Sequence, residues 1–191
     1  MPELSRPGPG TDGCAGRASS DPDTSTAADD RAARVAAPRI GVVVLTQGTR
    51  PVELTGALAS VQRQRDVQTQ IAVVGNGWQP TGIPDGVIAV GLPTNVGIPA
   101  GRNRGADAVE GEFIFFLDDD AELPSDRFLI DCVERVRRDP QIGLIQPSLS
   151  AASGETPPSR WVPRIRKGDP RDSGLVMSCL EAAVSLPLRV F

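Results

Sequence analysis

The stretch that decides the fold of this chain reads EFIFFLDDD, from Glu112 to Asp120. An apolar run of this length is typical of a strand buried on both faces, as in a parallel sheet. The run ends in three carboxylates, and strand ends of this kind lie at the edge where open α/β folds keep their ligand crevices. The sequence therefore predicts a ligand site directly after this strand.

Three adjacent carboxylates repel one another, and the repulsion needs relief. Two like charges about 4 Å apart repel by roughly 4 kcal/mol at an effective dielectric constant near 20. A hard divalent cation with oxygen ligands is the simplest relief. The alternative left open at this point is a solvated acidic turn that only ends the strand.

Composition excludes several classes of function. The 191 residues, 39% of them hydrophobic, suffice for one domain. The absence of histidine excludes Ser-His-Asp triads, Cys-His dyads and imidazole metal sites. A net charge of −4 argues against broad nucleic-acid binding. Cys14, Cys132 and Cys179 are too few and too widely spaced to indicate a disulfide framework or a zinc site.

The ends of the chain suggest location and domain organisation. The first ten residues lack the apolar core of a signal peptide, and nowhere do 18 apolar residues run together, so a soluble, cytoplasmic protein is expected. Residues 1–38 are rich in small and polar residues and predict a disordered tail. Residues 39–191 are expected to form the folded domain.

Strands and helices alternate from Arg39 onward. Strands are predicted at 40–45, 70–74, 87–90, 113–117 and 142–145, and helices from Pro51, over 99–109 and after Ser125 as N-cap. This β-α-β order predicts an α/β fold with a mostly parallel sheet and helices on both faces.

Parallel strands would bring three polar loops, 46–50, 76–78 and 118–120, to one edge of the sheet. A nucleotide would lie there, with its base near the first two loops and its phosphates near the acids. The chain has neither a Gly-x-Gly-x-x-Gly turn after the first strand nor a Gly-Lys-Ser/Thr loop, so the pyrophosphate is not held in either of those cradles. A metal bridging the acids and a diphosphate fits better, because it would neutralise charge on a departing nucleoside diphosphate.

Three motifs in this order carry a family resemblance. They are VVVLT at 42–46 with LASVQRQ at 58–64, NVGIPAGRNRG at 95–105, and FLDDDA at 116–121. Together they resemble the opening strand and helix, the "NxGxxxxRNxG" segment and the metal-binding Asp-x-Asp of inverting family 2 glycosyltransferases, over about residues 39–191. The resemblance implies the Rossmann-like GT-A fold of nucleotide-diphospho-sugar transferases.

The resemblance also implies an activity: transfer of a sugar from a nucleotide-sugar donor to a glycan or lipid-linked acceptor. Asp118 and Asp120 would bind Mn²⁺ or Mg²⁺, and Thr46, Arg102 and Asp118 would contact the nucleotide. The middle acid, Asp119, is expected to point away from the ligand. A role in cell wall or polysaccharide biosynthesis follows, and a lipid-linked acceptor would bring the protein to a membrane surface as a peripheral protein.

The chain departs from the family pattern at two places. Where many relatives carry an Asp for the base, it reads Val74-Gly75-Asn76-Gly77; Asn76 can donate and accept, so it could still read a base edge. In the family, the general base and most of the acceptor pocket follow a "GGFDE" segment, and residues 181–191 resemble the strand and turn before it. We therefore interpret the chain as the nucleotide-binding half, with the general base beyond Phe191 and Glu181 as an edge or loop residue.

Other interpretations stay open. The chain could be a non-catalytic fragment that binds a nucleotide sugar or a metal, because its acceptor half is missing. It could also be a haloacid-dehalogenase-like phosphatase, with Asp118 and Asp120 as nucleophile and acid. The arginine-rich segment 159–171 could be a mobile loop over the donor phosphates, although a solvated connector is the simpler reading.

Overall fold

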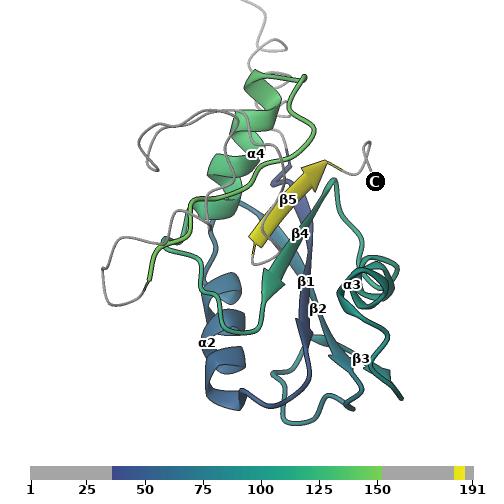
Figure 1. Ribbon diagram of the computed structural model, residues 1–191. Coiled ribbons are helices and arrows are strands. Elements are labelled where there is room, and N and C mark those ends of the chain that lie inside the picture. Colours follow the sequence, from purple (N-terminus) through teal and green to yellow (C-terminus); the bar gives the residue numbers. More distant parts are fainter. Residues whose placement is uncertain (1–35, 152–182, 188–191) are drawn as a thin grey trace, which may run out of the picture. The chain divides into compact units, whose positions relative to one another are not determined.

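The computed structural model describes residues 36–151 and 183–187 (Figure 1). These residues belong to a compact unit that spans Ala36–Phe191. Residues 1–35 of the predicted tail, the basic segment 159–171 and Glu181 lie outside the described residues. None of the helices in the described part of the chain combines the length and the apolar character needed to cross a bilayer.

The described elements alternate between strand and helix. Their order is β1 (Arg39–Thr46), α2 (Pro51–Gln62), β2 (Gln68–Asn76), β3 (Ile88–Leu92), α3 (Ile98–Ala106), β4 (Phe113–Asp118), α4 (Phe128–Arg138) and β5 (Ala183–Pro187). The sheet has the order β3-β2-β1-β4-β5. The first four of these strands are parallel, and β5 pairs antiparallel with β4 at the edge. The predicted α/β fold with a mostly parallel sheet is confirmed.

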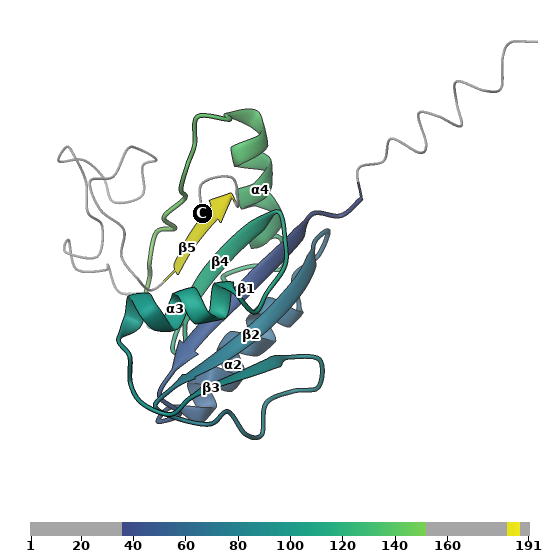
Figure 2. The same ribbon diagram turned by 90° about the vertical axis from the view of Figure 1, so that its right-hand side faces the viewer.

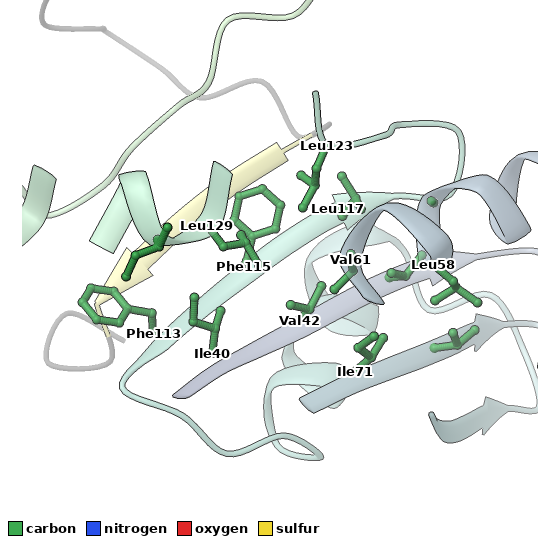
Figure 3. Close-up of a cluster of buried hydrophobic side chains, with 14 of the residues drawn as sticks. Ile40, Val42, Leu58, Val61, Ile71, Phe113, Phe115, Leu117, Leu123 and Leu129 are labelled. Carbon is green, nitrogen blue, oxygen red and sulfur yellow. The ribbon is translucent and has the colours of Figure 1, made fainter. Parts of the chain in front are cut away.

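The core lies in two layers, because alternate side chains of each strand point to opposite faces of the sheet. On one face, Phe113, Phe115 and Leu117 of β4 pack with side chains of β1, β2, α2 and α4 (Figure 3). On the other face, Ile114 and Phe116 join a smaller cluster below α3. Figure 2 shows α3 on the face of the sheet opposite to α2. Helices therefore cover both faces, as the sequence predicts.

Two local predictions are wrong. No strand forms over 142–145; Ile142 and Ile145 pack against the core beside α4, and the edge of β4 is occupied by β5 instead. Ser125 does not cap α4, which begins at Phe128. The side chain of Gln64 takes that part, since its Oε1 accepts a hydrogen bond from the Leu129 N–H at 2.9 Å and satisfies a donor of the first helical turn.

Two glycines let α3 lie close to the sheet. Gly101 and Gly105 are one turn apart and both buried. A Cβ on Gly105 would lie 2.2 Å from Val43 Cγ1 and 2.9 Å from Val74 Cγ2. Substitution therefore requires the helix or these two strands to move, and the position of α3 in turn places Arg102, which follows Gly101 directly.

We predict that Gly105→Ala lowers the free energy of unfolding by about 1–3 kcal/mol, because the added methyl group overpacks the contact with β1 and β2. The matched control is Arg104→Ala, the adjacent exposed position of the same helix, where a change within about 0.5 kcal/mol is expected. Urea unfolding of both variants measures the difference. Equal stability of the two variants would show that α3 has room to shift.

Candidate functional site

The carboxyl ends of β1, β2 and β4 meet at one edge of the sheet. The register aligns Leu45 with Asp118 and Thr46 with Gly75. A groove of about 660 Å³ opens there. Its lining residues are Leu45, Thr46, Gln47, Thr49, Arg50, Asn76, Asn95, Gly97, Ile98, Asp118, Asp119 and Asp120. Of the predicted site residues, all but Arg102 line this groove.

Arg102 reaches the site through Asp118. Its Nη2 donates to Asp118 Oδ1 at 2.8 Å, and the guanidinium lies over the Phe116 ring, 5.5 Å from the centroid. The Arg102 side chain is only 12% exposed. Burial raises the pKa of Asp118 above its ordinary value, Arg102 opposes that rise, and Asp120 and Asp119 add to it. Arg102 thus stabilises a carboxylate that burial would otherwise favour in its protonated form.

Asp119 is turned toward the groove. Thr46 Oγ1 donates to Asp119 Oδ2 at 2.6 Å, and the same hydroxyl accepts a hydrogen bond from the Gly48 N–H at 2.9 Å. The Asp119 side chain is 13% exposed. The expectation that the middle acid points away from the ligand is therefore wrong, because the buried Thr46 hydroxyl offers it a partner on the groove side.

Arg50, which was not among the residues predicted from the sequence, is a second cation at this site. Its Nη1 lies 3.4 Å from Asp119 Oδ1 and also pairs with Asp120 Oδ2. The three carboxylates Asp118–Asp120, called the acid turn from here on, are therefore partly neutralised by two guanidiniums, where the sequence suggested a metal ion as the simplest relief. The signal was available: Arg50 is the cation of the 46–50 loop, which the parallel topology brings beside the acid turn.

The acid turn suits a cation that is shared with a ligand. Within residues 36–151 and 183–187, no three His, Cys, Asp or Glu side chains gather in a way that could hold a metal ion. The carboxylate oxygens of Asp118 and Asp120 are nevertheless the donors that Mg²⁺ and Mn²⁺ prefer. Proteins usually hold Mg²⁺ with one or two carboxylates, and phosphates and water supply the other ligands. These residues fit a cation of that kind.

Asn76 joins the end of β2 to the loop before α3. Its Nδ2 donates to Asn95 Oδ1 at 2.9 Å and to the Gly97 carbonyl at 3.3 Å, and its Oδ1 accepts from the Val96 N–H at 2.8 Å. Both N–H groups of this buried amide are thus used within the chain, and Oδ1 keeps one acceptor position.

The residue before Asn76 has no room for a side chain. A Cβ on Gly75 would lie 2.0 Å from the Trp78 carbonyl oxygen. The groove is therefore lined here by Asn76, at the end of β2, and by Asn95 and Gly97 of the loop before α3, with no acid at position 75.

Comparisons with known proteins agree on the fold. The family model described as Glycosyl transferase family 2 matches residues 51–174. The structure of S. aureus TarS 1-349 is similar at TM-score 0.56 and 17% identity, covering 78% of this chain and 47% of that one. The mannosyltransferase PcManGT from Pyrobaculum calidifontis, in complex with GDP-Man and Mn²⁺, is similar at TM-score 0.52 and 14% identity, covering 80% and 45%. This chain spans about half the length of these two proteins.

Among curated proteins, no significant sequence match was found. The two structural likenesses, at these identities, concern the fold, and the family model concerns the sequence. The family match begins at α2 and includes α3, β4 and the acid turn, so it covers most of the part of the fold that forms the groove.

We predict that Asn76→Asp destabilises the fold by about 1–3 kcal/mol, because a carboxylate cannot donate to Asn95 Oδ1 and the Gly97 carbonyl and would be left buried beside two acceptors. Asn103→Asp, the same chemical change at an exposed position of α3, is the control. Hydrogen exchange at Val96 and Gly97 should accelerate only in the Asn76 variant. Unchanged exchange there would show that Asn76 does not hold the loop.

Proposed function

The chain belongs to glycosyltransferase family 2, and on that premise we propose that it binds a nucleotide-sugar donor in the groove and transfers the sugar, with inversion, to a glycan or lipid-linked acceptor. The observation that carries the proposal is the convergence of Thr46, Asn76 and the acid turn on one groove at the carboxyl ends of parallel strands. This is the edge at which open α/β sheets bind nucleotides.

In this proposal, the donor lies with its base toward the Asn76 side of the groove and its diphosphate toward the acid turn. Thr46 lines the groove between them. Asn76 takes part chiefly through the 95–97 loop that it holds, and its Oδ1 can accept one further hydrogen bond from the base. Arg102 contributes by fixing Asp118 at the groove wall.

Asp118 and Asp120 would hold Mn²⁺ or Mg²⁺ together with the donor diphosphate. Bound there, the cation supplies Lewis-acid neutralisation of the nucleoside diphosphate as it departs. The complex of the similar mannosyltransferase with GDP-Man and Mn²⁺ supports this choice of donor class and cation. A cytoplasmic location and a part in cell wall or polysaccharide biosynthesis belong to the same proposal.

The family match does not favour either alternative reading of the acid turn, the haloacid-dehalogenase-like phosphatase or the non-catalytic binding fragment. The binding-fragment and transferase hypotheses both place the nucleotide sugar in this groove, and one measurement distinguishes them. Only a transferase releases nucleoside diphosphate from a nucleotide sugar faster when an acceptor is added. Incubation with a panel of nucleotide sugars and glycan or lipid acceptors therefore separates the two.

We predict that the chain binds a nucleoside diphosphate only when Mn²⁺ or Mg²⁺ is present, and that Asp120→Asn weakens this binding about 10- to 100-fold, because a charged ligand of the cation is lost. Isothermal calorimetry with UDP and GDP, in Mn²⁺ and in excess chelator, measures both effects. Asp85→Asn, an exposed acid outside the groove, should bind like the wild type. Equal affinity in chelator would contradict the metal role, and failure to bind any nucleoside diphosphate would contradict the proposed function.

A further inference from the structure

The two arginines that pair with the acid turn differ in burial. The Arg102 side chain is 12% exposed, and it is held both by Asp118 and by its position over the Phe116 ring. The side chains of Arg50 and its partner Asp120 are 50% and 47% exposed. The pair of Arg102 and Asp118 is thus fixed by packing, whereas Arg50 and Asp120 lie on the solvent side of the groove, where Arg50 can exchange its partner.

Arg50 occupies a carboxylate that a cation would need. Its Nη1 pairs with Asp120 Oδ2 and lies 3.4 Å from Asp119 Oδ1. A cation bound by Asp120 would stand within a few ångströms of the guanidinium, where two positive charges repel each other. The exposed ion pair between Arg50 and Asp120 contributes little to stability, so it offers little resistance to separation. A divalent cation that binds Asp120 would therefore compete with Arg50 for the same carboxylate.

The displaced guanidinium remains beside the ligand. Arg50 directly precedes α2 and lines the groove together with Thr49. A diphosphate that shares a cation with Asp118 and Asp120 would bring anionic oxygens to this part of the groove. The guanidinium fork binds phosphate oxygens through paired hydrogen bonds.

We propose that Arg50 is the internal counter-cation of the acid turn: it neutralises Asp120 while no metal is bound, and it passes to the phosphate oxygens of the donor when a divalent cation takes its place. This inference rests on the proposed function, because it needs a cation at Asp118 and Asp120. It gives Arg50 two opposite effects, competition with the free cation and attraction of the nucleotide.

The test begins with Mn²⁺ alone. Titration of the full chain, with free Mn²⁺ followed by electron paramagnetic resonance, should show that Arg50→Gln binds Mn²⁺ about three- to tenfold more tightly than the wild type. Arg65→Gln is the matched control, because Arg65 also forms an exposed ion pair with an aspartate, Asp126, and its loss changes the net charge equally. Arg65→Gln should bind Mn²⁺ like the wild type, which excludes a general charge effect.

The second measurement adds UDP or GDP at saturating Mn²⁺. Here Arg50→Gln should bind the nucleotide about five- to fiftyfold more weakly, since a charge-assisted phosphate contact is lost. Arg50→Lys keeps the charge and loses the planar fork. Its affinity for Mn²⁺ alone should match that of the wild type, and its affinity for the nucleotide should lie between those of the wild type and Arg50→Gln. Thermal unfolding of all variants confirms that each is folded.

Opposite changes in the two affinities of Arg50→Gln support the proposal. The role of Arg50 is overturned if this variant binds Mn²⁺ no more tightly than Arg65→Gln, or if it binds the nucleotide as well as the wild type. In either case the proposed function still stands, provided that the wild type binds the nucleotide in a metal-dependent way. If neither the wild type nor Arg50→Gln binds Mn²⁺, with or without nucleotide, both the metal role and this inference fall, whereas the proposed function falls only if no nucleoside diphosphate binds.

Discussion

The parallel pairing of β1 with β4 is the constraint on which the groove depends. It aligns Leu45 with Asp118. Thr46, at the end of β1, and Arg50, in the loop that follows β1, therefore lie beside the acid turn at the end of β4. A slip of one residue would turn every side chain of β4 to the other face, so that Phe115 would leave the larger core layer for the smaller one. The apolar run of β4 prevents that slip, because its two sets of side chains fill two separate core layers.

Charge in the groove is divided between a fixed pair and an exchangeable one. Arg102, buried against Phe116, holds Asp118 in place. Arg50 and Asp120 meet in solvent, where an ion pair contributes little and separates at low cost. Three carboxylates against two guanidiniums leave the turn with one negative charge, which suits a site that gains a divalent cation and a diphosphate together.

The other half of the groove is built without charge. The glycines of α3 allow the helix to approach β1 and β2 closely, and the buried Asn76 amide ties the loop before that helix to the end of β2. The same close approach aims Arg102 at Asp118. The position of the fixed pair and the shape of the base side are therefore consequences of one helix–sheet contact.

Much of the architecture was predictable from the sequence by itself. The strands β1–β4, the helices on both faces, the edge that carries the groove and the acid turn followed from apolar runs and β-α-β order, because burial and periodicity are local properties of the chain. The strand predicted at 142–145 was wrong, since its apolar residues pack on the core while β5, about forty residues later, pairs with β4. The local sequence pattern cannot show which of two apolar segments pairs with the free edge of β4.

Only the tertiary structure decided the partners of the polar groups. Asp119 turned inward to Thr46, 73 residues earlier. Asp120 found Arg50, 70 residues earlier, and Gln64 replaced the nearby Ser125 at the start of α4. The residue types indicated a site, but the partners in a hydrogen bond or ion pair are set by their distance in space. Loops 70 residues apart in the sequence come close to each other only when the sheet pairs their strands.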